Sequence, residues 1–302
     1  MRITNNMLIN NMLSNLNTNL TRMNLYQNQL ATGKKISLPS DDPIVASRAL
    51  KLRTDVAEIE QYKRNVNDAT SWMEITETTL AQMGEVMKRV KELAVEGSNG
   101  TQTPEELDKI NQEVKQLKTQ MTHLANTTYS GRYIFSGYKT DKPLMDENGV
   151  FQIDIADNEQ IHYEIGIGDD ININVTGADL FNNGTDAAAN DTSSLISTFD
   201  ALISALDSGD NTAVGNMLTQ IDAEYDNILR VRSGVGARMN RLELTSNRLD
   251  DDNINFTKLM SQNEDVDIAE AIMNLINEEN VYRASLSAGA KVIQPSLIDF
   301  LR

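Results

Sequence analysis

Residues 44–96 read IVASRALKLRTDVAEIEQYKRNVNDATSWMEITETTLAQMGEVMKRVKELAVE and decide the fold. Apolar residues recur along this stretch in alternating steps of three and four, beginning with Val45, Ala49, Leu52 and Val56. This spacing places them in one stripe along a helix. At 1.5 Å per residue, such a helix is roughly 80 Å long. The glycine-rich residues 97–100 follow directly and are a typical C-terminal stop.

The helical pattern is repeated further along the chain. Thr103 and Glu106 form a capping box for a second helix, and the short connection predicts that it runs antiparallel to the first. After residue 190 the same spacing returns over 195–206, over 229–260, where Leu229 begins the stripe, and over 268–293. Most of the chain is therefore predicted to be helical.

Between these helices the hydrophobic period changes from helical to alternating. Residues 133–135, 150–155, 161–165 and 171–175 each read as a short strand, separated by Gly, Asp and Asn turns. Residues 133–183 hold ten acidic side chains and only two lysines. The sequence therefore predicts a mainly α protein. A long antiparallel helical bundle or coiled coil, made from the N- and C-terminal segments, carries a small inserted antiparallel β-domain.

A shorter apolar stripe lies near the N-terminus, within residues 9–30. Nine asparagines between residues 5 and 28 oppose helix formation there, because the Asn side chain competes for backbone hydrogen bonds. We expect a helix with this composition to be weakly ordered in the free monomer and to depend on a partner. Residues 31–43 break it, with Asp42 as the predicted N-cap of the long helix and Pro43 at its first position.

These patterns predict three domains, each differing from its neighbours in period or charge. Residues 1–43 and 267–302 form a terminal helical assembly domain that is disordered in the monomer. Residues 44–132 and 190–266 form a helical rod, and residues 133–189 form the acidic β-domain. Each end of the chain carries a small positive charge, while the chain as a whole has a net charge of −17.

The composition excludes several classes of function. Among 302 residues there is no Cys and there are only two His, so thiolate catalysis, disulfides and common zinc motifs are absent. The acidic balance argues against binding to nucleic acid or to anionic membranes. The acidic pairs 146–147 and 169–170 lack EF-hand spacing, and His123 and His162 fit ordinary polar positions. We therefore predict no enzyme activity, no cofactor and no metal site.

Several short motifs resemble the flagellin superfamily and, within it, the proteins at the junction of hook and filament. The matching residues are 1–4 (MRIT), 32–34 (TGK), 40–43 (SDDP), 99–101 (NGT), 131–140 (GRYIFSGYKT) and 176–178 (TGA). The run 131–140 resembles the junction proteins more than flagellin. Residues 265–269 and 300–302 resemble flagellin tails, so a flagellin-type filament subunit remains an alternative.

The resemblance implies a secreted structural subunit that is exported through the flagellar type III route without a cleaved signal peptide. It implies a ring of copies at the hook–filament junction that adapts one lattice to the other. The implied partners are copies of the chain itself, the adjoining hook-associated junction protein, flagellin, and a cytosolic export chaperone that holds the C-terminal helix. A cytosolic coiled-coil scaffold is a further alternative from another class.

The terminal stripes are the predicted assembly interface. Its residues are Ile9, Leu13, Leu16, Leu20, Met23 and Leu30 near the N-terminus, and Ile272, Leu275, Tyr282, Leu286 and Ile293 near the C-terminus. We expect the two stripes to pack on each other and then to dock beside other subunits. Stripes of this kind also fit an ordinary intramolecular core, but the asparagines and the break before residue 44 favour assembly.

Overall fold

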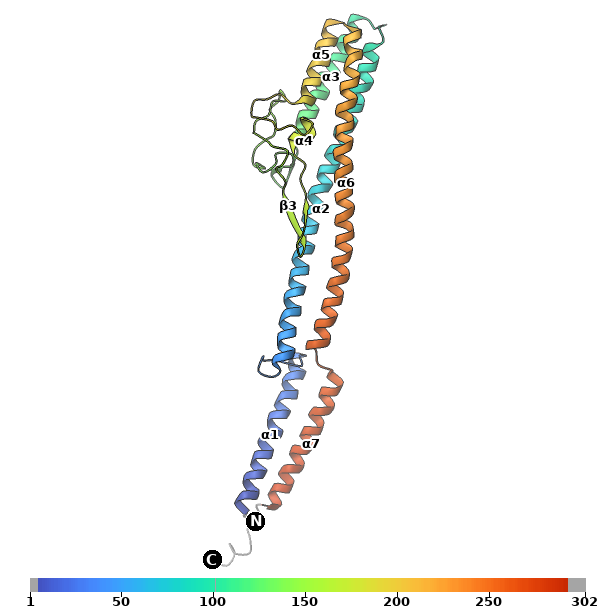
Figure 1. Cartoon of the computed structure of the whole chain (residues 1–302). Helices are drawn as coiled ribbons and strands as arrows, with labels where there is room; N and C mark the ends of the chain where they lie inside the picture. Colours follow the sequence, from blue (N-terminus) through green and yellow to red (C-terminus); the bar gives the residue numbers. More distant parts are fainter. Residues whose placement is uncertain (1–4, 101, 293–302) are drawn as a thin grey trace, which may run out of the picture. The chain divides into compact units, whose positions relative to one another are not determined.

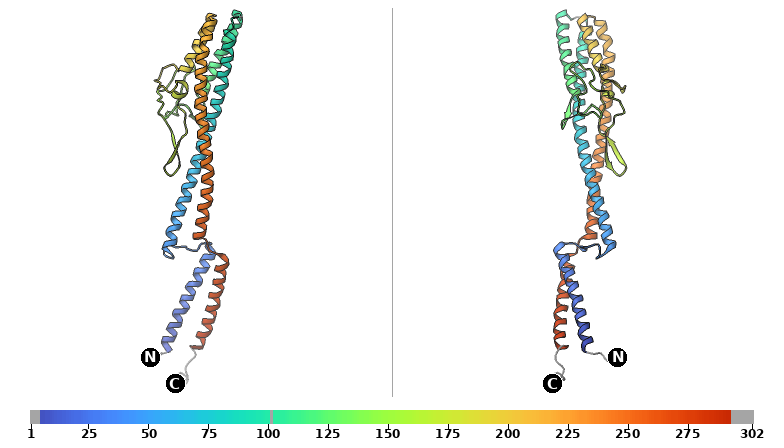
Figure 2. Two further views of the ribbon diagram at one scale, coloured as in Figure 1. Left: turned by 45° about the vertical axis from the view of Figure 1, so that its right-hand side comes forward. Right: turned by 90° about the vertical axis from the view of Figure 1, so that its left-hand side faces the viewer.

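The computed structural model describes residues 5–100 and 102–292 (Figures 1 and 2). It contains two compact units. Unit 1 comprises Met1–Glu58 with Asp252–Arg302, and unit 2 comprises Ile59–Asp251. Long helices from both ends of the sequence and short antiparallel strands between them confirm the predicted mainly α fold with an inserted β region.

Unit 1 is built on two helices from opposite ends of the sequence. The helix α1 spans Asn5–Thr32 and α7 spans Ile268–Val292, and they lie side by side and antiparallel (Figure 1). The unit also contains the start of α2 (Pro43–Ser98) and the end of α6 (Asn211–Glu264). Asp42 caps α2 as predicted, because its Oδ1 accepts the N–H groups of Ile44 at 3.0 Å and Val45 at 3.1 Å.

Unit 2 holds the main helical core. The helices α3 (Pro104–Ala125) and α5 (Ser194–Ser208) pack together beside α2 and α6 (Figure 1). The predicted capping box is confirmed: the Thr103 N–H donates to Glu106 Oε2 at 2.7 Å, and the Glu106 N–H donates to Thr103 Oγ1 at 3.4 Å. Large side chains with almost no exposure fill the interior, among them Met73, Leu80, Met83, Met87, Leu93 and Met121.

The buried stripe of α6 passes through Ile228 and not through Leu229 as predicted, and it already includes Val214 and Ile221. Leu229 is 39% exposed, whereas Ile228 is fully buried. Val231 and Val235 continue from Ile228 in steps of three and four and are also buried. Residues 228 and 229 are both apolar, so the spacing alone was compatible with a stripe through either one. The packing of the folded chain shows that residue 228 faces inward.

The inserted region contains two small hairpins. The strands β1 (Thr128–Tyr129) and β2 (Arg132–Tyr133) pair with each other, and β3 (His162–Gly166) pairs with β4 (Asp169–Asn172), both antiparallel. The expected strand over 150–155 is wrong, because these residues make only isolated bridges, for example between Phe151 and Met145. The strand expected over 133–135 is also wrong beyond Tyr133.

The alternating pattern at 150–155 nevertheless reports burial correctly. Phe151, Ile153 and Ile155 are at most 5% exposed and form part of a compact apolar core of the insert. The rings of Phe135 and Phe181 meet edge to face in this core, with 6.1 Å between their centroids. Phe181 lies on the short helix α4 (Gly177–Phe181). Here the alternating pattern correctly marked the residues that face inward, although these residues do not form a paired strand.

Arginines of α6 hold the acidic insert. Arg230 pairs with Asp179, and Arg241 pairs with Asp169. The guanidinium of Arg238 donates to the carbonyl oxygens of Asn172 at 3.2 Å and Asn174 at 3.0 Å. Burial lowers the pKa of Arg238 from its ordinary value. Part of the negative charge of the insert is thus paired with basic side chains of α6, which in the case of Arg230 and Asp179 lie 51 residues apart in the chain.

We predict that Gly177→Ala destabilises unit 2 by about 1–3 kcal/mol. A Cβ at this position would lie 2.6 Å from a Leu144 methyl group and 3.1 Å from the Phe135 carbonyl oxygen, so the core of the insert must shift. Urea unfolding followed by the emission of Trp72, the single tryptophan, measures the change.

The matched control is Gly236→Ala. This glycine lies inside α6, and a Cβ there has nothing within 4 Å. It should raise the free energy of unfolding by roughly 0.5–1 kcal/mol through helix propensity. Equal stability of the two variants would contradict the packing described for Gly177.

Candidate assembly surface

The contact between α1 and α7 is thin. On α1 only Leu16, at 8% exposure, and Asn19, at 6%, are buried among residues with described side chains. On α7 the buried residues with described side chains are Ala271 and Gly289. Two of these four residues are small and one is polar, so little apolar area is removed from water when the helices pair.

A glycine allows the close approach of the two helices near their ends. Gly289 of α7 is buried, and a Cβ there would lie 2.5 Å from the Sδ of Met12 on α1. The Met12 thioether therefore occupies the space that any larger residue at 289 would take. Along the same face the Arg22 Nε lies 3.4 Å from Glu278 Oε1, which adds a partly exposed ion pair.

The predicted interface residues fall into three groups. Leu16 is buried, and the half-buried residues are Ile9, Met23, Leu30, Leu275 and Tyr282. The exposed residues are Leu13 at 51%, Leu20 at 38%, Ile272 at 43% and Leu286 at 45%. Ile293 lies outside the described residues. The structure therefore brings part of the predicted set together and leaves four leucine and isoleucine side chains facing water.

Sequence reasoning missed a further set of exposed apolar side chains on the same two helices. They are Met7, Leu8 and Leu25 on α1, and Ile268, Met273, Ile276 and Val281 on α7, with exposures between 41% and 59%. The signal was present, because these residues extend the apolar stripe to positions beside the seam. With the four above they make eleven large apolar side chains without cover, which we call the terminal apolar surface. Large exposed apolar patches are typical of interaction sites, so these side chains are the candidate assembly surface.

The sequence of α1 gives little help to an isolated helix. Thr18, Thr21 and Thr32 turn their hydroxyl groups back onto the carbonyl oxygens four residues earlier, at 2.8–2.9 Å. Such bonds slightly destabilise a helix, and the asparagines add a further unfavourable propensity. A helix with this composition gains most of its stability from the surfaces packed against it.

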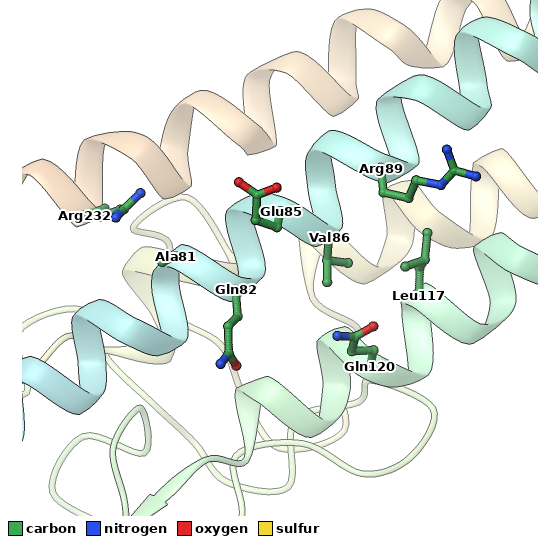
Figure 3. A pocket seen from close by; sticks show the side chains of 8 residues that line it. All are labelled: Ala81, Gln82, Glu85, Val86, Arg89, Leu117, Gln120 and Arg232. Atoms are coloured by element: carbon green, nitrogen blue, oxygen red, sulfur yellow. The ribbon is translucent and has the colours of Figure 1, made fainter.

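A shallow groove of about 460 Å³ lies on unit 2 between α2, α3 and α6 (Figure 3). Val86 of α2 and Leu117 of α3 line its apolar part, with Arg89 and Arg232 at its edges. Both arginines are already paired, Arg89 with Glu113 and Arg232 with Glu77, each at 2.6 Å. The hydrogen bond that Arg89 donates to Glu113 is the main cause that raises the pKa of Arg89. The groove therefore presents two paired arginines and the carboxylate of Glu85 beside a small apolar patch.

Carboxylates of both acidic pairs, 146–147 and 169–170, have protein partners. Asp146 accepts the N–H groups of Asn148 and Val150, both at 2.9 Å, and Asp170 lies 2.6 Å from His162 Nδ1. Within residues 5–100 and 102–292 no cluster of three or more His, Asp or Glu residues is arranged to hold a metal ion. Over the same residues, no helix combines the length and the apolarity that crossing a membrane requires.

Comparison with known proteins identifies the family. The N-terminal helical region of bacterial flagellin matches residues 3–140, and the C-terminal helical region matches residues 218–301. Flagellar hook-associated protein 3 of Escherichia coli K12 is 30% identical over 282 residues, covering 87% of this chain and 88% of that protein. Flagellin of Bacillus subtilis 168 is 28% identical over 304 residues, covering 97% of each chain.

A solved structure shows the same architecture. The crystal structure of FlgL from Bacillus cereus superposes with a TM-score of 0.59 at 25% identity, covering 70% of this chain and 99% of that one. The family match and the shared fold agree with the resemblance to the flagellin superfamily. The chain belongs to the flagellin family and is a structural subunit of the bacterial flagellum.

Proposed function

We propose that the chain forms the junction ring between the flagellar hook and filament and adapts one lattice to the other through α1 and α7. The observation that carries this proposal is the terminal apolar surface, which the pair of helices leaves exposed. The similarity to hook-associated protein 3 supports the junction role, and FlgL of Bacillus cereus supports the matching fold.

Assembly on this surface is physically favourable. Burying a Leu or Ile side chain stabilises by about 1.5–3 kcal/mol, so eleven partly exposed apolar residues represent a large driving force. The conformational entropy that is lost when α1 and α7 become ordered opposes assembly. Repetition of the same contact around a closed ring multiplies the remaining gain for the assembly as a whole. One occupant of the surface is therefore a second copy of this chain.

The wider set of partners belongs to the same proposal. We infer that the ring contacts the adjoining hook-associated protein on one side and flagellin on the other, and that an export chaperone holds the C-terminal helix before secretion. The three-domain division also remains a proposal: terminal residues 1–43 and 267–302, rod residues 44–132 and 190–266, and insert residues 133–189. The chain acts in this proposal as a structural adaptor without catalytic activity or cofactor.

A flagellin-type filament subunit is the second candidate. The similarity to Bacillus subtilis flagellin, at 28% identity over the full length, favours it almost as strongly as the similarity to hook-associated protein 3 favours the junction. Copy number separates the two, because a junction ring needs a handful of subunits per flagellum and a filament needs thousands. A cytosolic scaffold has less support, since the family is flagellar.

We predict that Leu13→Asp and Leu286→Asp each abolish incorporation into the flagellum while the monomer keeps its unfolding midpoint. Both side chains are exposed in the monomer, so the change removes assembly contacts and leaves the core of unit 2 intact. Complementation of a strain that lacks the protein, scored by motility and by immunogold labelling, measures incorporation.

Leu244→Asp is the matched control, because Leu244 is 71% exposed on α6 outside the terminal helices. It should incorporate normally. Leu16→Asp, which places a charge inside the α1–α7 contact, should fail with the first two. Normal flagella with Leu13→Asp and Leu286→Asp together would exclude assembly through the terminal helices.

We further predict that the purified chain does not grow into long filaments on its own. A junction adaptor has two different neighbours, so stacking identical rings lacks the matched face that a filament subunit provides. Electron microscopy of concentrated protein, together with immunogold counting on isolated flagella, provides the readout. Long filaments of the pure chain, or label along the whole filament, would assign the chain to the flagellin alternative.

A further inference from the structure

Two carboxylates lie at the C-terminal end of α6, which is the helix end least favourable for negative charge. Glu264 is the last residue of α6 and Asp265 follows it, so both lie at the negative end of the helix dipole. Glu264 is only 1% exposed. A buried carboxylate at a helix C-terminus is unfavourable unless cations and hydrogen-bond donors compensate it. The groups that compensate the charge of Glu264 therefore show which contacts hold it in place.

The compensation comes from two distant parts of unit 1. Arg53 of α2 donates two hydrogen bonds to the Glu264 carboxylate, from Nε to Oε1 at 2.7 Å and from a terminal nitrogen to Oε2 at 2.6 Å. Lys34, just after α1, places its Nζ 3.2 Å from Glu264 Oε2 and 2.7 Å from Asp265 Oδ1. Paired bonds between guanidinium and carboxylate are the strongest common form of this contact.

The backbone pairs at the same point. The Lys35 N–H donates to the Glu264 carbonyl oxygen at 2.6 Å, and the Val266 N–H donates to the Gly33 carbonyl oxygen at 3.1 Å. Lys34 and Asp265 thereby form an antiparallel bridge between residues 231 positions apart. Gly33 has a φ of +68°, a left-handed conformation that lets the chain turn from α1 into this bridge.

We propose that residues 33–35 and 264–266, together with Arg53, form a latch that keeps the two connectors paired in the unassembled chain. The latch fixes the C-terminal end of α1 beside the N-terminal end of α7. The two helices are then tethered at one point and form their contact in a fixed register when they order. The contacts described above support the latch itself. Its use in assembly depends on the proposed function.

The advantage of the latch is entropic. Two segments joined at their bases meet at a high effective concentration, so their pairing becomes an intramolecular step. Without the latch, each terminal helix would search separately, and the thin α1–α7 contact offers little energy to offset that search. The same latch leaves the outer apolar faces of both helices free for neighbouring subunits.

The charges of the latch set its pH range. The bonds from Arg53, and then from Lys34, hold the pKa of Glu264 below its usual value, so the stability it contributes is lost as pH falls below about 4.5 and through the lowered pKa. Lys34 has a raised pKa because of Asp265, so its contribution is lost only as pH rises above about 10.5. The Ser261 hydroxyl also donates to Asp265 at 2.6 Å. The titratable side chains that line the same pocket as Asp265 are Tyr26, Lys35, Asp267 and Glu270. The latch is therefore closed across the neutral range.

Hydrogen exchange on the full-length free chain at neutral pH tests the latch. In the wild type, the Lys35 and Val266 amides should be protected even where α1 and α7 exchange rapidly. Glu264→Gln keeps the shape of the side chain and removes its charge, and it should speed exchange at both amides about tenfold or more. Glu58→Gln, a change of the same kind at an exposed position in the same unit, should leave them unchanged.

Two further readouts keep the test decisive. The Trp72 emission of Glu264→Gln should match the wild type, which shows that unit 2 stays folded, and Arg53→Met added to Glu264→Gln should give little further loss. Equal protection in the wild type and Glu264→Gln, unprotected connector amides in the wild type, or loss of the folded Trp72 emission would each overturn the latch. Protected connectors in a chain that fails to form a junction would refute only the proposed function.

Discussion

Two helices packed side by side can bury only one face each, and this constraint shapes the terminal part of the chain. The apolar residues of α1 and α7 cover more than one face, so eleven large side chains stay in contact with water. No rearrangement of a single helix pair can cover them all. Covering them requires further helices, and in the proposed assembly neighbouring subunits supply these helices. A subunit that is incomplete at its ends is suited to assembly.

The middle of the chain is built in the opposite way. In unit 2 the methionines of α2 and α3, together with Leu80 and Leu93, are almost completely buried, and α3 and α5 are capped. The acidic insert is held by paired arginines of α6 and by an apolar core around Phe135 and Phe181. This unit therefore buries a large apolar core of its own. The difference between a complete middle and incomplete ends allows the subunit to remain folded while its assembly elements stay available.

Sequence patterns predicted the features that depend on local spacing. The helices, the Asp42 cap and the Thr103 capping box follow from residues that are close together in the chain. Contacts between distant residues gave no comparable signal. The pairing of Lys34 with Asp265 and of Arg241 with Asp169 joins segments that no local rule connects. The strand expected over 150–155 failed because an alternating pattern reports which side chains face inward, and pairing depends on neighbours elsewhere.

The candidate surface was predicted in part for the same reason. Spacing identified the inner seam residues Leu16, Leu275 and Tyr282, but it assigned Leu13 and Leu286 to the contact between the two helices. Their exposure becomes visible only when the real packing of α1 against α7 is known. Acids at the C-terminal end of α6 conflicted with the helix dipole, and this conflict was the one local clue to the latch.

The central claim is that the terminal helices are completed by neighbouring subunits. Amide exchange, compared between the free chain and isolated hook–filament junctions, tests it most directly. The account predicts rapid exchange over residues 5–32 and 268–292 in the free chain, slow exchange over most of 59–251, and strong protection of the terminal helices after assembly. Equally slow exchange from residue 5 to residue 292 in the isolated monomer would contradict it.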